Sequence, residues 1–396
     1  MVVRDKVRAV GLAARVGRHV AREKVGPKVR PTTPEAVPPS AESITTEWLT
    51  AVLCRNVPGA RVVKVGLGRG DNGTSARRAV AVTYNEKGAT AGLPTRLFTK
   101  STATFASRLL LGLTEIVEGE TLFYNRMRPE LTIRSPRSFH ACFDPRTYRS
   151  LVLVEDLAHE GWKFPDPLHN RVTRADAEDM VSEMATYHAA FWDSSRFDTD
   201  LRRLRPAREW QENLNRKVGF EKRTLVGLER AREVVPRELY ADRNALYPAF
   251  MRSLELHRTA PATLLHQDVH LGNWLRDADG RMGLYDWQCV ARGHWALDYS
   301  YALAGGLATE DRRNWEKDLL NLYLERLGEH GVGEPPSFEE AWLGYRQQPM
   351  HALVFGLFTL GGSRFEPELQ PRDYTLAAIK RIAQHVVDLE SINAIG

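Results

Sequence analysis

Cysteine is scarce in this chain of 396 residues, which has only Cys54, Cys142 and Cys289. The number is odd, the spacing is wide, and no Cys-x-x-Cys pair occurs, so a disulfide framework or a cysteine-based zinc site is not expected. This pattern favours a reducing, cytoplasmic environment. The chain also lacks an apolar run near the roughly 20 residues that a membrane-spanning helix needs. The longest such run, around Leu353 to Leu360, predicts a buried helix.

A basic surface is missing from most of the chain as well. Residues 1–31 hold nine Lys and Arg against two Asp and Glu, whereas the rest of the chain holds 46 basic and 48 acidic side chains. The net charge of +5 therefore resides in the N-terminal segment. Beyond that segment no basic patch is interleaved with aromatic residues, so nucleic acid is not an expected partner.

Two interpretations of residues 1–31 remain open. The segment is either a solvated, partly disordered extension or an amphipathic helix in weak contact with an anionic membrane or a partner. The helical interpretation rests on arginines that share one helical face, which are Arg4, Arg8, Arg15, Arg18 and Arg22. The prolines between residues 31 and 39 then predict an extended linker.

Polar residues with a specific spacing occupy the segment from 265 to 287. Asp268 precedes Asn273 by five residues, and Asp286 follows Asn273 by thirteen. Phosphoryl transfer needs a carboxylate that accepts a hydroxyl proton, and oxygen ligands that hold Mg²⁺ on the phosphates of ATP. We therefore expect Asp268 to act as the catalytic base, and Asn273 and Asp286 to be the metal ligands.

A predicted β-hairpin explains how these residues come together. Asp279-Gly280 lies in a turn between two short segments, Trp274 to Arg276 and Arg281 to Tyr285, and Asp-Gly at such a place is a strong hairpin signal. Folding this hairpin brings Asn273, at its start, next to Asp286, at its end.

The same block resembles a known family. His266-x-Asp268-x-x-x-x-Asn273 matches the catalytic loop of protein kinases, but Asp286-Trp287-Gln288 stands where those kinases carry Asp-Phe-Gly. This combination is similar to the aminoglycoside phosphotransferase and choline kinase superfamily. Residues 293–301 and 310–313 look most like its ecdysteroid-kinase-like (CHK-type) branch. The resemblance runs from about residue 46 to the C-terminus and is most specific at 265–301.

The resemblance implies an α+β, protein-kinase-like, two-lobed fold. A small β-rich N-lobe would contain an antiparallel sheet, and a larger C-lobe would be mainly helical. We accordingly expect a basic extension and proline-rich linker at 1–44 and a nucleotide-binding N-lobe at 45–155. The C-lobe at 156–396 would carry the catalytic loop, the metal site and the acceptor-substrate site.

A glycine-rich segment lies between two predicted strands of the N-lobe. Gly70 and Gly73 would let backbone N–H groups approach phosphates. The resemblance makes Ser75 the side-chain contact to phosphate. The alternative is an ordinary glycine-rich hairpin turn without such a role.

Two further elements complete the expected ATP site. Lys100 ends a predicted strand and is the natural partner of the α- and β-phosphates. The resemblance points to Glu120 as the partner of Lys100, whereas the alternative is a surface salt bridge. The apolar run from Leu151 resembles the hinge of the family, where adenine would bond to the backbone at Glu155 and Leu157.

The sequence therefore predicts an ATP- and Mg²⁺-dependent small-molecule kinase that phosphorylates a hydroxyl group. The alternative is a catalytically silent, pseudokinase-like binding protein, recruited to a membrane surface by its basic tail. A silent member would be expected to lose one of Lys100, Asp268, Asn273 and Asp286, and all four are present. Aromatic residues mixed with arginines in the C-terminal region favour an acceptor that is less cationic than an aminoglycoside, but the sequence does not identify the acceptor, the choice between ATP and GTP or the oligomeric state.

Overall fold

The computed structural model describes residues 2–26, 30–70, 75–114, 116–166, 168–169, 171–363 and 370–396. The chain divides into two compact units. The first, here called the small unit, contains Met1–Glu130 and Pro136–Gly161. The second, here called the large unit, contains Leu131–Ser135 and Trp162–Gly396.

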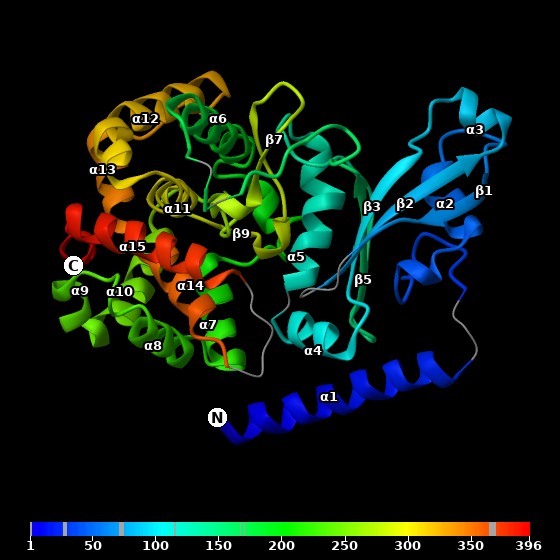
Figure 1. The fold of residues 1–396 in the computed structure, drawn as a ribbon, viewed down its shortest axis with the longest axis horizontal. Helices are drawn as coiled ribbons and strands as arrows, with labels where there is room; N and C mark the ends of the chain where they lie inside the picture. The colour runs from blue at the N-terminus through cyan, green and yellow to red at the C-terminus, as the bar shows by residue number, and fades with distance from the viewer. Residues whose placement is uncertain are drawn as a thin grey trace. The chain divides into compact units, whose positions relative to one another are not determined.

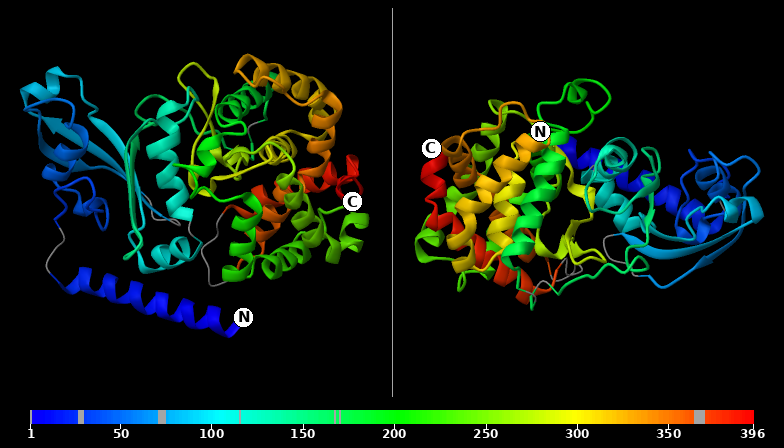
Figure 2. Two further views of the ribbon diagram at one scale, coloured as in Figure 1. Left: turned by 180° about the vertical axis from the view of Figure 1, so that it is seen from behind. Right: turned by 90° about the horizontal axis from the view of Figure 1, so that it is seen from above.

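An antiparallel five-stranded sheet forms the centre of the small unit, in the order β1-β2-β3-β5-β4. Its strands β1–β3 are drawn in blue to cyan in Figures 1 and 2. Apolar and β-branched residues dominate these segments, as expected for a sheet with a buried face. The strands are β1 (Val62–Leu67), β2 (Ala76–Tyr84), β3 (Arg96–Ser101), β4 (Ser138–Asp144) and β5 (Arg149–Glu155).

Helices accompany this sheet within the small unit. Helix α2 starts where the Thr45 hydroxyl accepts the N–H of Trp48 at 3.0 Å, which is an N-cap. Trp48 is fully buried and joins the core cluster around the sheet. The helical elements are α1 (Val2–Val25), η1 (Ala41–Ser43), α2 (Thr46–Leu53), α3 (Glu86–Thr90), α4 (Phe105–Thr114), α5 (Ile116–Leu122), the π-helical turn η2 (Phe123–Met127) and η3 (Arg128–Glu130).

The N-terminal segment is helical, so the disordered interpretation is wrong for its described residues 2–25. Helix α1 contacts α4 of the same unit, and Val16 is fully buried. Glu23 anchors the helix, because each of its carboxylate oxygens lies 2.7 Å from a guanidinium nitrogen of Arg108. Arg149 also donates to Glu23, at 2.7 Å. The helix is therefore held by an ion pair between residues far apart in the chain, and no spacing in the sequence indicates this pair.

The large unit is mainly helical. Within it, α6 packs against α12, and α14 packs against α8 and α15 (Figure 1). Its main helices are α6 (Arg174–Ala190), α7 (Ala207–Val218), α8 (Phe220–Arg230), α10 (Arg243–Glu255), α11 (Ala296–Gly306), α12 (Thr309–Glu329), α13 (Phe338–Gln347), α14 (Met350–Leu360) and α15 (Arg372–Asp388). Shorter helical elements are η4 (Ser195–Asp198), α9 (Arg237–Ala241), η5 (Leu256–Arg258), η6 (Leu271–Asn273), η7 (Trp287–Cys289) and α16 (Ser391–Ile395).

Two small antiparallel sheets lie in the same unit. One pairs β6 (Thr263–Leu265) with β9 (Ala291–Gly293), and the other pairs β7 (Trp274–Arg276) with β8 (Met282–Leu284). The α+β class, with an antiparallel sheet in a small unit and a mainly helical large unit, is therefore confirmed. In the described part of the chain no helix is long and apolar enough to cross a membrane.

Candidate active site

The hairpin predicted from Asp279-Gly280 is confirmed. Strand β7 pairs with β8 through Trp274↔Leu284, Leu275↔Gly283 and Arg276↔Met282. At the turn, the Asp277 carboxylate accepts the N–H groups of Asp279 at 3.0 Å and of Arg281 at 2.9 Å. Gly280 has a φ of +83°, a conformation that glycine adopts without steric cost. The residue types at the turn thus set the register of the hairpin.

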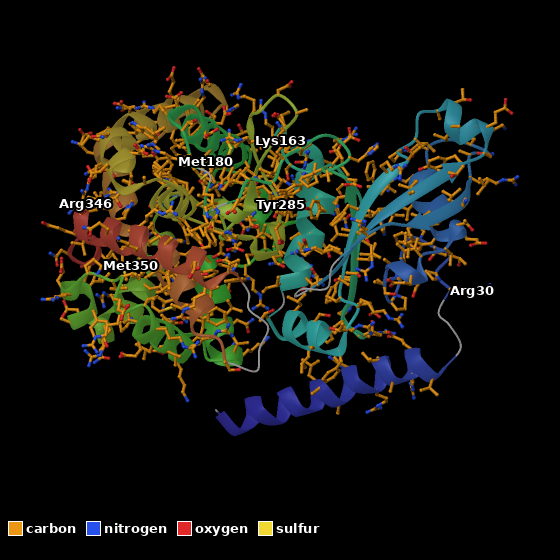
Figure 3. All side chains as sticks on the ribbon, in the orientation of Figure 1. Arg30, Lys163, Met180, Tyr285, Arg346 and Met350 are labelled. Carbon is orange, nitrogen blue, oxygen red and sulfur yellow. The ribbon has the colours of Figure 1, made fainter. Side chains whose placement is uncertain are left out.

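That register places Asn273 and Asp286 at the same end of the hairpin. The N–H of Tyr285 donates to the carbonyl oxygen of Asn273 at 3.1 Å, so Asp286 is the next residue beyond this pair. Tyr285 is labelled in Figure 3, as is Lys163, whose backbone pairs with β7 at Arg276. Asp286 itself has a φ of 66°, an uncommon conformation for a non-glycine residue that is often found at functional sites.

Asp268 and Asn273 are in direct contact. The amide nitrogen of Asn273 donates to the carbonyl oxygen of Asp268 at 2.8 Å and lies 3.3 Å from its carboxylate oxygen Oδ2. Because both contacts use Nδ2, the amide oxygen of Asn273 is the atom of this side chain that suits a cation. The loop therefore holds the predicted base and one predicted metal ligand in a fixed relation.

His266 connects this loop to the end of the hairpin. Its Nδ1 accepts the N–H of Asp268 at 3.2 Å, and its Nε2 lies 3.0 Å from the carbonyl oxygen of Tyr285. A neutral ring with its proton on Nε2 satisfies both bonds. Burial lowers the pKa of His266, which favours this neutral state. His266 thus connects Asp268 to Tyr285, the residue directly before Asp286. Its ring acts as a structural hydrogen-bonding group.

Asp298 braces the catalytic loop from within the core. Its fully buried carboxylate accepts the N–H of His266 at 2.7 Å, the N–H of Gln267 at 2.8 Å and the hydroxyl of Tyr187 at 2.8 Å. Burial alone favours the neutral acid, but the nearby His188 ring and the hydrogen bond from the N–H of His266 keep the pKa of Asp298 below its ordinary value. An ionised Asp298 therefore fixes the backbone immediately before Asp268.

Helix α6 carries three acidic side chains at helical spacing, and two of them pair with arginines of the hairpin. Asp176 pairs with Arg276 of β7, and Asp179 pairs with Arg281 beside β8. Glu183 lies one turn further along and accepts a bond from Arg134 at 2.6 Å. The spacing of Asp176, Asp179 and Glu183 places them on one face of α6. The sequence contains this acidic row, but its arginine partners have no local signal.

Trp287 has a structural role beside Asp286. Its indole N–H donates to the hydroxyl of Ser135 at 2.9 Å, and its ring packs edge-on against Tyr187 and His266. The side chain is fully buried. Trp287 therefore fixes the chain on the C-terminal side of Asp286, as His266 does on the N-terminal side.

Lys100 and Glu120 form an ion pair in the small unit. Lys100 Nζ lies 2.9 Å from Glu120 Oε1, with the two side chains only 13 % and 7 % exposed. A largely buried ion pair of this kind differs from the surface salt bridge of the alternative interpretation. Lys100 is on β3, opposite Val152 of β5, so the sheet register fixes its position. Its contact with ATP phosphates stays a prediction.

The remaining predicted nucleotide residues are only partly described. Ser75 is buried, and within the described residues its hydroxyl has no hydrogen-bond partner. At Gly70 an added Cβ would lie 1.9 Å from the carbonyl oxygen of Arg77, so only glycine fits there. Gly73 lies outside the described residues. The contact of Ser75 with phosphate stays a prediction.

The predicted hinge residues end strand β5. Glu155 forms an ion pair with Arg137 at 2.9 Å, and its N–H donates to the carbonyl oxygen of Arg137 at 3.0 Å. Leu157 is buried just beyond the strand. The contact of adenine with the backbone at these residues stays a prediction.

The donor set of Asn273 and Asp286 fits Mg²⁺. One amide oxygen and one carboxylate are hard oxygen donors, and Mg²⁺ commonly takes one or two such protein ligands together with phosphate oxygens and water. In the described part of the chain no three His, Cys, Asp or Glu side chains gather in a way that could hold a metal ion. The role of Asn273 and Asp286 as metal ligands stays a prediction.

The sequence of the chain matches one family model. Residues 117–336 match the phosphotransferase enzyme family, APH. Because the match spans more than half of the chain, this protein belongs to that family. The predicted superfamily and the protein-kinase-like, two-lobed fold class are confirmed, whereas the CHK-type branch stays a prediction.

Solved structures that resemble the chain share little sequence with it. Choline kinase from Cryptosporidium parvum Iowa II is 14 % identical, with a TM-score of 0.49 over 85 % of this chain and 92 % of that one. Choline kinase LicA from Streptococcus pneumoniae is 14 % identical, with a TM-score of 0.43 over 83 % and 94 %. Macrolide 2'-phosphotransferase MphH from Brachybacterium faecium is 12 % identical, with a TM-score of 0.43 over 84 % and 98 %. A comparison with curated proteins gave no match. The family assignment rests on the family model.

Proposed function

We propose that this protein is an ATP- and Mg²⁺-dependent kinase that transfers the γ-phosphate to a hydroxyl group of a small-molecule acceptor. The observation that carries this proposal is the contact between Asp268 and Asn273. Asn273 directly precedes the β7–β8 hairpin, and Asp286 follows it at the same end. Membership of the phosphotransferase family gives the reaction class. Together they support our assignment of a base and two oxygen ligands, the groups that phosphoryl transfer needs.

Asp268 is the residue to which we assign proton transfer. Its carboxylate would accept the proton of the acceptor hydroxyl as that oxygen attacks phosphorus, and the bond from phosphorus to the β–γ bridging oxygen of ATP would break. A positioned base typically contributes about 10²- to 10⁴-fold in rate. The side chain is 20 % exposed, so an acceptor can reach it. Asn273 and the brace at Asp298 would keep its orientation constant during turnover.

We assign two sets of residues to the nucleotide, the metal ligands and the side chains that would contact the phosphates. Asn273 and Asp286 would hold Mg²⁺, which when bound neutralises charge on the phosphate oxygens. Lys100, oriented by Glu120, would bind the α- and β-phosphates, and the Ser75 hydroxyl would add a donor. We assign these roles from the family resemblance and from the burial and pairing of each side chain.

We further propose that the acceptor is less cationic than an aminoglycoside. A site for several ammonium groups should be rich in carboxylates. Among the described side chains, His270 lies 3.8 Å from Asp268, and Gln370 and Tyr374 contact His270 in turn; none of these three is acidic. This surrounding favours a neutral alcohol, in keeping with the proposed CHK-type branch.

The second candidate is a silent binding protein recruited to an anionic surface by α1. The exposed Arg18 and Arg22 on that helix favour such a contact. A catalytically silent protein is disfavoured because it would be expected to lose one of four residues that are all present, which are Asp268, Asn273, Asp286 and the paired Lys100. Membrane contact through α1 and catalysis are compatible with each other.

An ADP-release screen tests the proposed function. Wild-type protein with Mg²⁺ and ATP would be offered neutral alcohols, sterols, sugars, nucleosides, macrolides, choline-like amines and aminoglycosides. We expect turnover with one class, and a loss of at least about 10²-fold in Asp268→Asn with ATP-dependent thermal stabilisation retained. Asp279→Asn, at the exposed tip of the same hairpin, is the matched control and should keep full activity. Turnover in Asp268→Asn equal to the control would refute the role of Asp268, and the absence of both turnover and ATP binding would refute the kinase.

A further inference from the structure

Gln267 immediately precedes the proposed base and has an unusual backbone conformation. Its φ is 64°, in the left-handed region that residues other than glycine rarely adopt, because the side chain is strained there. Such conformations persist only where surrounding groups hold them, and they are frequent at functional sites. The partners of Gln267 are therefore the groups that fix the backbone leading into Asp268.

Three polar groups of Gln267 are held from three different elements. Its N–H donates to Asp298 Oδ1 of α11 at 2.8 Å, and its side-chain nitrogen donates to the carbonyl oxygen of Cys289 in η7 at 2.7 Å. Its carbonyl oxygen accepts a bond from Nε2 of His351, on α14, at 2.7 Å. The carbonyl group next to the base thus depends on a ring that lies 84 residues further along the chain.

The bond to Gln267 determines the protonation of the His351 ring. A carbonyl oxygen can only accept, so Nε2 carries the proton. Burial lowers the pKa of His351 to about 4, which keeps the ring neutral and leaves Nδ1 without a proton. Among the described residues, Nδ1 has no hydrogen-bond partner. The ring therefore acts on its surroundings through the Nε2–H group that it gives to Gln267.

Aromatic neighbours fix the orientation of this imidazole. The side chain of His351 is 1 % exposed, and its ring centre lies 4.0 Å from that of Phe355, one turn further along α14. Phe250 of α10 and Tyr301 of α11 each place a ring centre 5.8 Å away. Because protein interiors are close-packed, the ring cannot turn without displacing these neighbours. Its Nε2–H group is therefore directed at the loop before any substrate binds.

We propose that His351 is a positioning residue for Asp268, which it orients by holding Gln267 in the left-handed conformation. The carbonyl group of Gln267 and the N–H of Asp268 belong to one planar peptide unit. His351 binds the oxygen of this unit at 2.7 Å, and His266 Nδ1 accepts its N–H at 3.2 Å. Two histidines thus fix the plane from which the base extends. This inference rests on the proposed function, because it concerns the orientation of the base in that reaction.

Two substitutions of similar length separate the hydrogen bond of His351 from its packing. His351→Gln keeps a nitrogen donor the same number of bonds from the backbone as Nε2, whereas His351→Met fills the space without a donor. With the acceptor found in the ADP-release screen, we expect kcat to fall about 10- to 100-fold in His351→Met and to stay within about threefold in His351→Gln. The KM for ATP should be unchanged in both. Equal kcat in the two variants would overturn the proposal.

His385→Met is the matched control for this comparison. His385 is also fully buried in the large unit, and among the described residues neither of its ring nitrogens has a hydrogen-bond partner. The control should keep the kcat of the wild type. A fall of kcat in His385→Met equal to that in His351→Met would show that loss of any buried histidine is enough, and would refute the inference.

A glycine at position 267 tests whether backbone strain connects His351 to the base. Glycine adopts a positive φ without steric cost, so it needs the bond from His351 less than glutamine does. When Gln267→Gly is already present, His351→Met should therefore lower kcat further by less than about threefold, since coupled residues are non-additive. An undiminished effect of His351→Met in the glycine background would contradict the proposal, because the two positions would then act independently.

Hydrogen exchange gives a measurement that does not depend on turnover. The amides of Gln267 and Asp268 should exchange at least about tenfold faster in His351→Met than in His351→Gln, because the loop opens more often without this bond. The amide of Arg281, which is bonded to Asp277 in the hairpin, should exchange equally in both. Unchanged exchange at positions 267 and 268 would refute the role of His351, whereas a failure to find any phosphorylated acceptor would refute only the proposed function.

Discussion

Replacement of Asp298 by asparagine tests how the core controls the catalytic loop. The carboxylate accepts three hydrogen bonds, from the N–H groups of His266 and Gln267 and from the hydroxyl of Tyr187. Asparagine keeps one oxygen and replaces the other with a donor. Its best orientation preserves the two bonds made by Oδ2 and directs an NH₂ group at the N–H of Gln267. The residue whose backbone loses its bond is thus the direct neighbour of Asp268.

The structure sets the size of the effect. A hydrogen bond to a charged group is worth about 1.5–3 kcal/mol, and a buried N–H left unsatisfied costs about 1–3 kcal/mol. We therefore expect Asp298→Asn to lower the free energy of unfolding by about 2–4 kcal/mol, without unfolding the protein at 25 °C. Because a displacement of about 1 Å at a catalytic group can cost about 100-fold in rate, we expect kcat to fall about 10- to 100-fold.

Three measurements check this expectation. Urea unfolding gives the change in stability, ADP release gives kcat, and hydrogen exchange of the peptide around Gln267 reports whether its amide loses protection. Tyr187→Phe is the matched control, because it removes one bond to the same carboxylate and leaves both loop bonds in place. It should cost about 1 kcal/mol and leave kcat close to that of the wild type. A wild-type kcat in a destabilised Asp298→Asn, or an equal fall of kcat in Tyr187→Phe, would show that the brace does not position Asp268.

Two further changes have clear expected outcomes. Glu23→Gln removes the negative charge that pairs with the fully buried Arg108, so the free energy of unfolding of the small unit should fall by about 3 kcal/mol in chemical unfolding. Glu35→Gln, at an exposed position, should change it little. Equal effects of both variants would contradict the anchoring of α1. Burial lowers the pKa of His351 to about 4, while an unfolded histidine titrates near about 6.5. The stabilisation from the neutral His351 is therefore fully present above about pH 6.5 and is lost as the pH falls towards 4. In unfolding titrations, His351→Gln should reduce the slope of the unfolding free energy against pH by up to about 1.4 kcal/mol per pH unit. An unchanged slope would contradict this role of His351.

The hairpin was predictable because its information is local. Asp277 to Gly280 contain the residue types that stabilise a tight turn, and the strands on both sides are short and apolar. Strand pairing then follows from the turn, and the proximity of Asn273 and Asp286 follows from strand pairing. The loop motif with Asp268 could be recognised for the same reason, since all its members lie within nine residues.

The supports of the site were not predictable in the same way. Only the structure shows that Asp298 binds the backbone of His266 and Gln267. The partners of α6, such as Arg276 for Asp176, lie about 100 residues away in the chain. A charged residue can pair with many others of opposite sign, so composition and spacing do not select one of them.

The N-terminal segment is a second case in which the sequence alone could not decide between two structures. Its arginines and its spacing allowed both a solvated extension and an amphipathic helix. Burial of Val16 and the bond that Arg108 donates to Glu23 decide for a helix that packs on its own unit. Neither residue stood out in the sequence, because a lone glutamate in a basic segment has no distinctive pattern.

By itself the sequence determined the class of fold, the hairpin, the catalytic-loop motif and the family of this protein. The hairpin and the loop motif depend on residue order over short distances, where turn chemistry acts directly, and the resemblance that this motif carries implied the family and the class of fold. The tertiary structure decided which donors meet the carboxylates of Asp268 and Asp298, and that His351 of α14 binds the backbone of Gln267. Such contacts depend on the packing of helices far apart in the chain, and the energy of each bond depends on burial that only the folded chain provides.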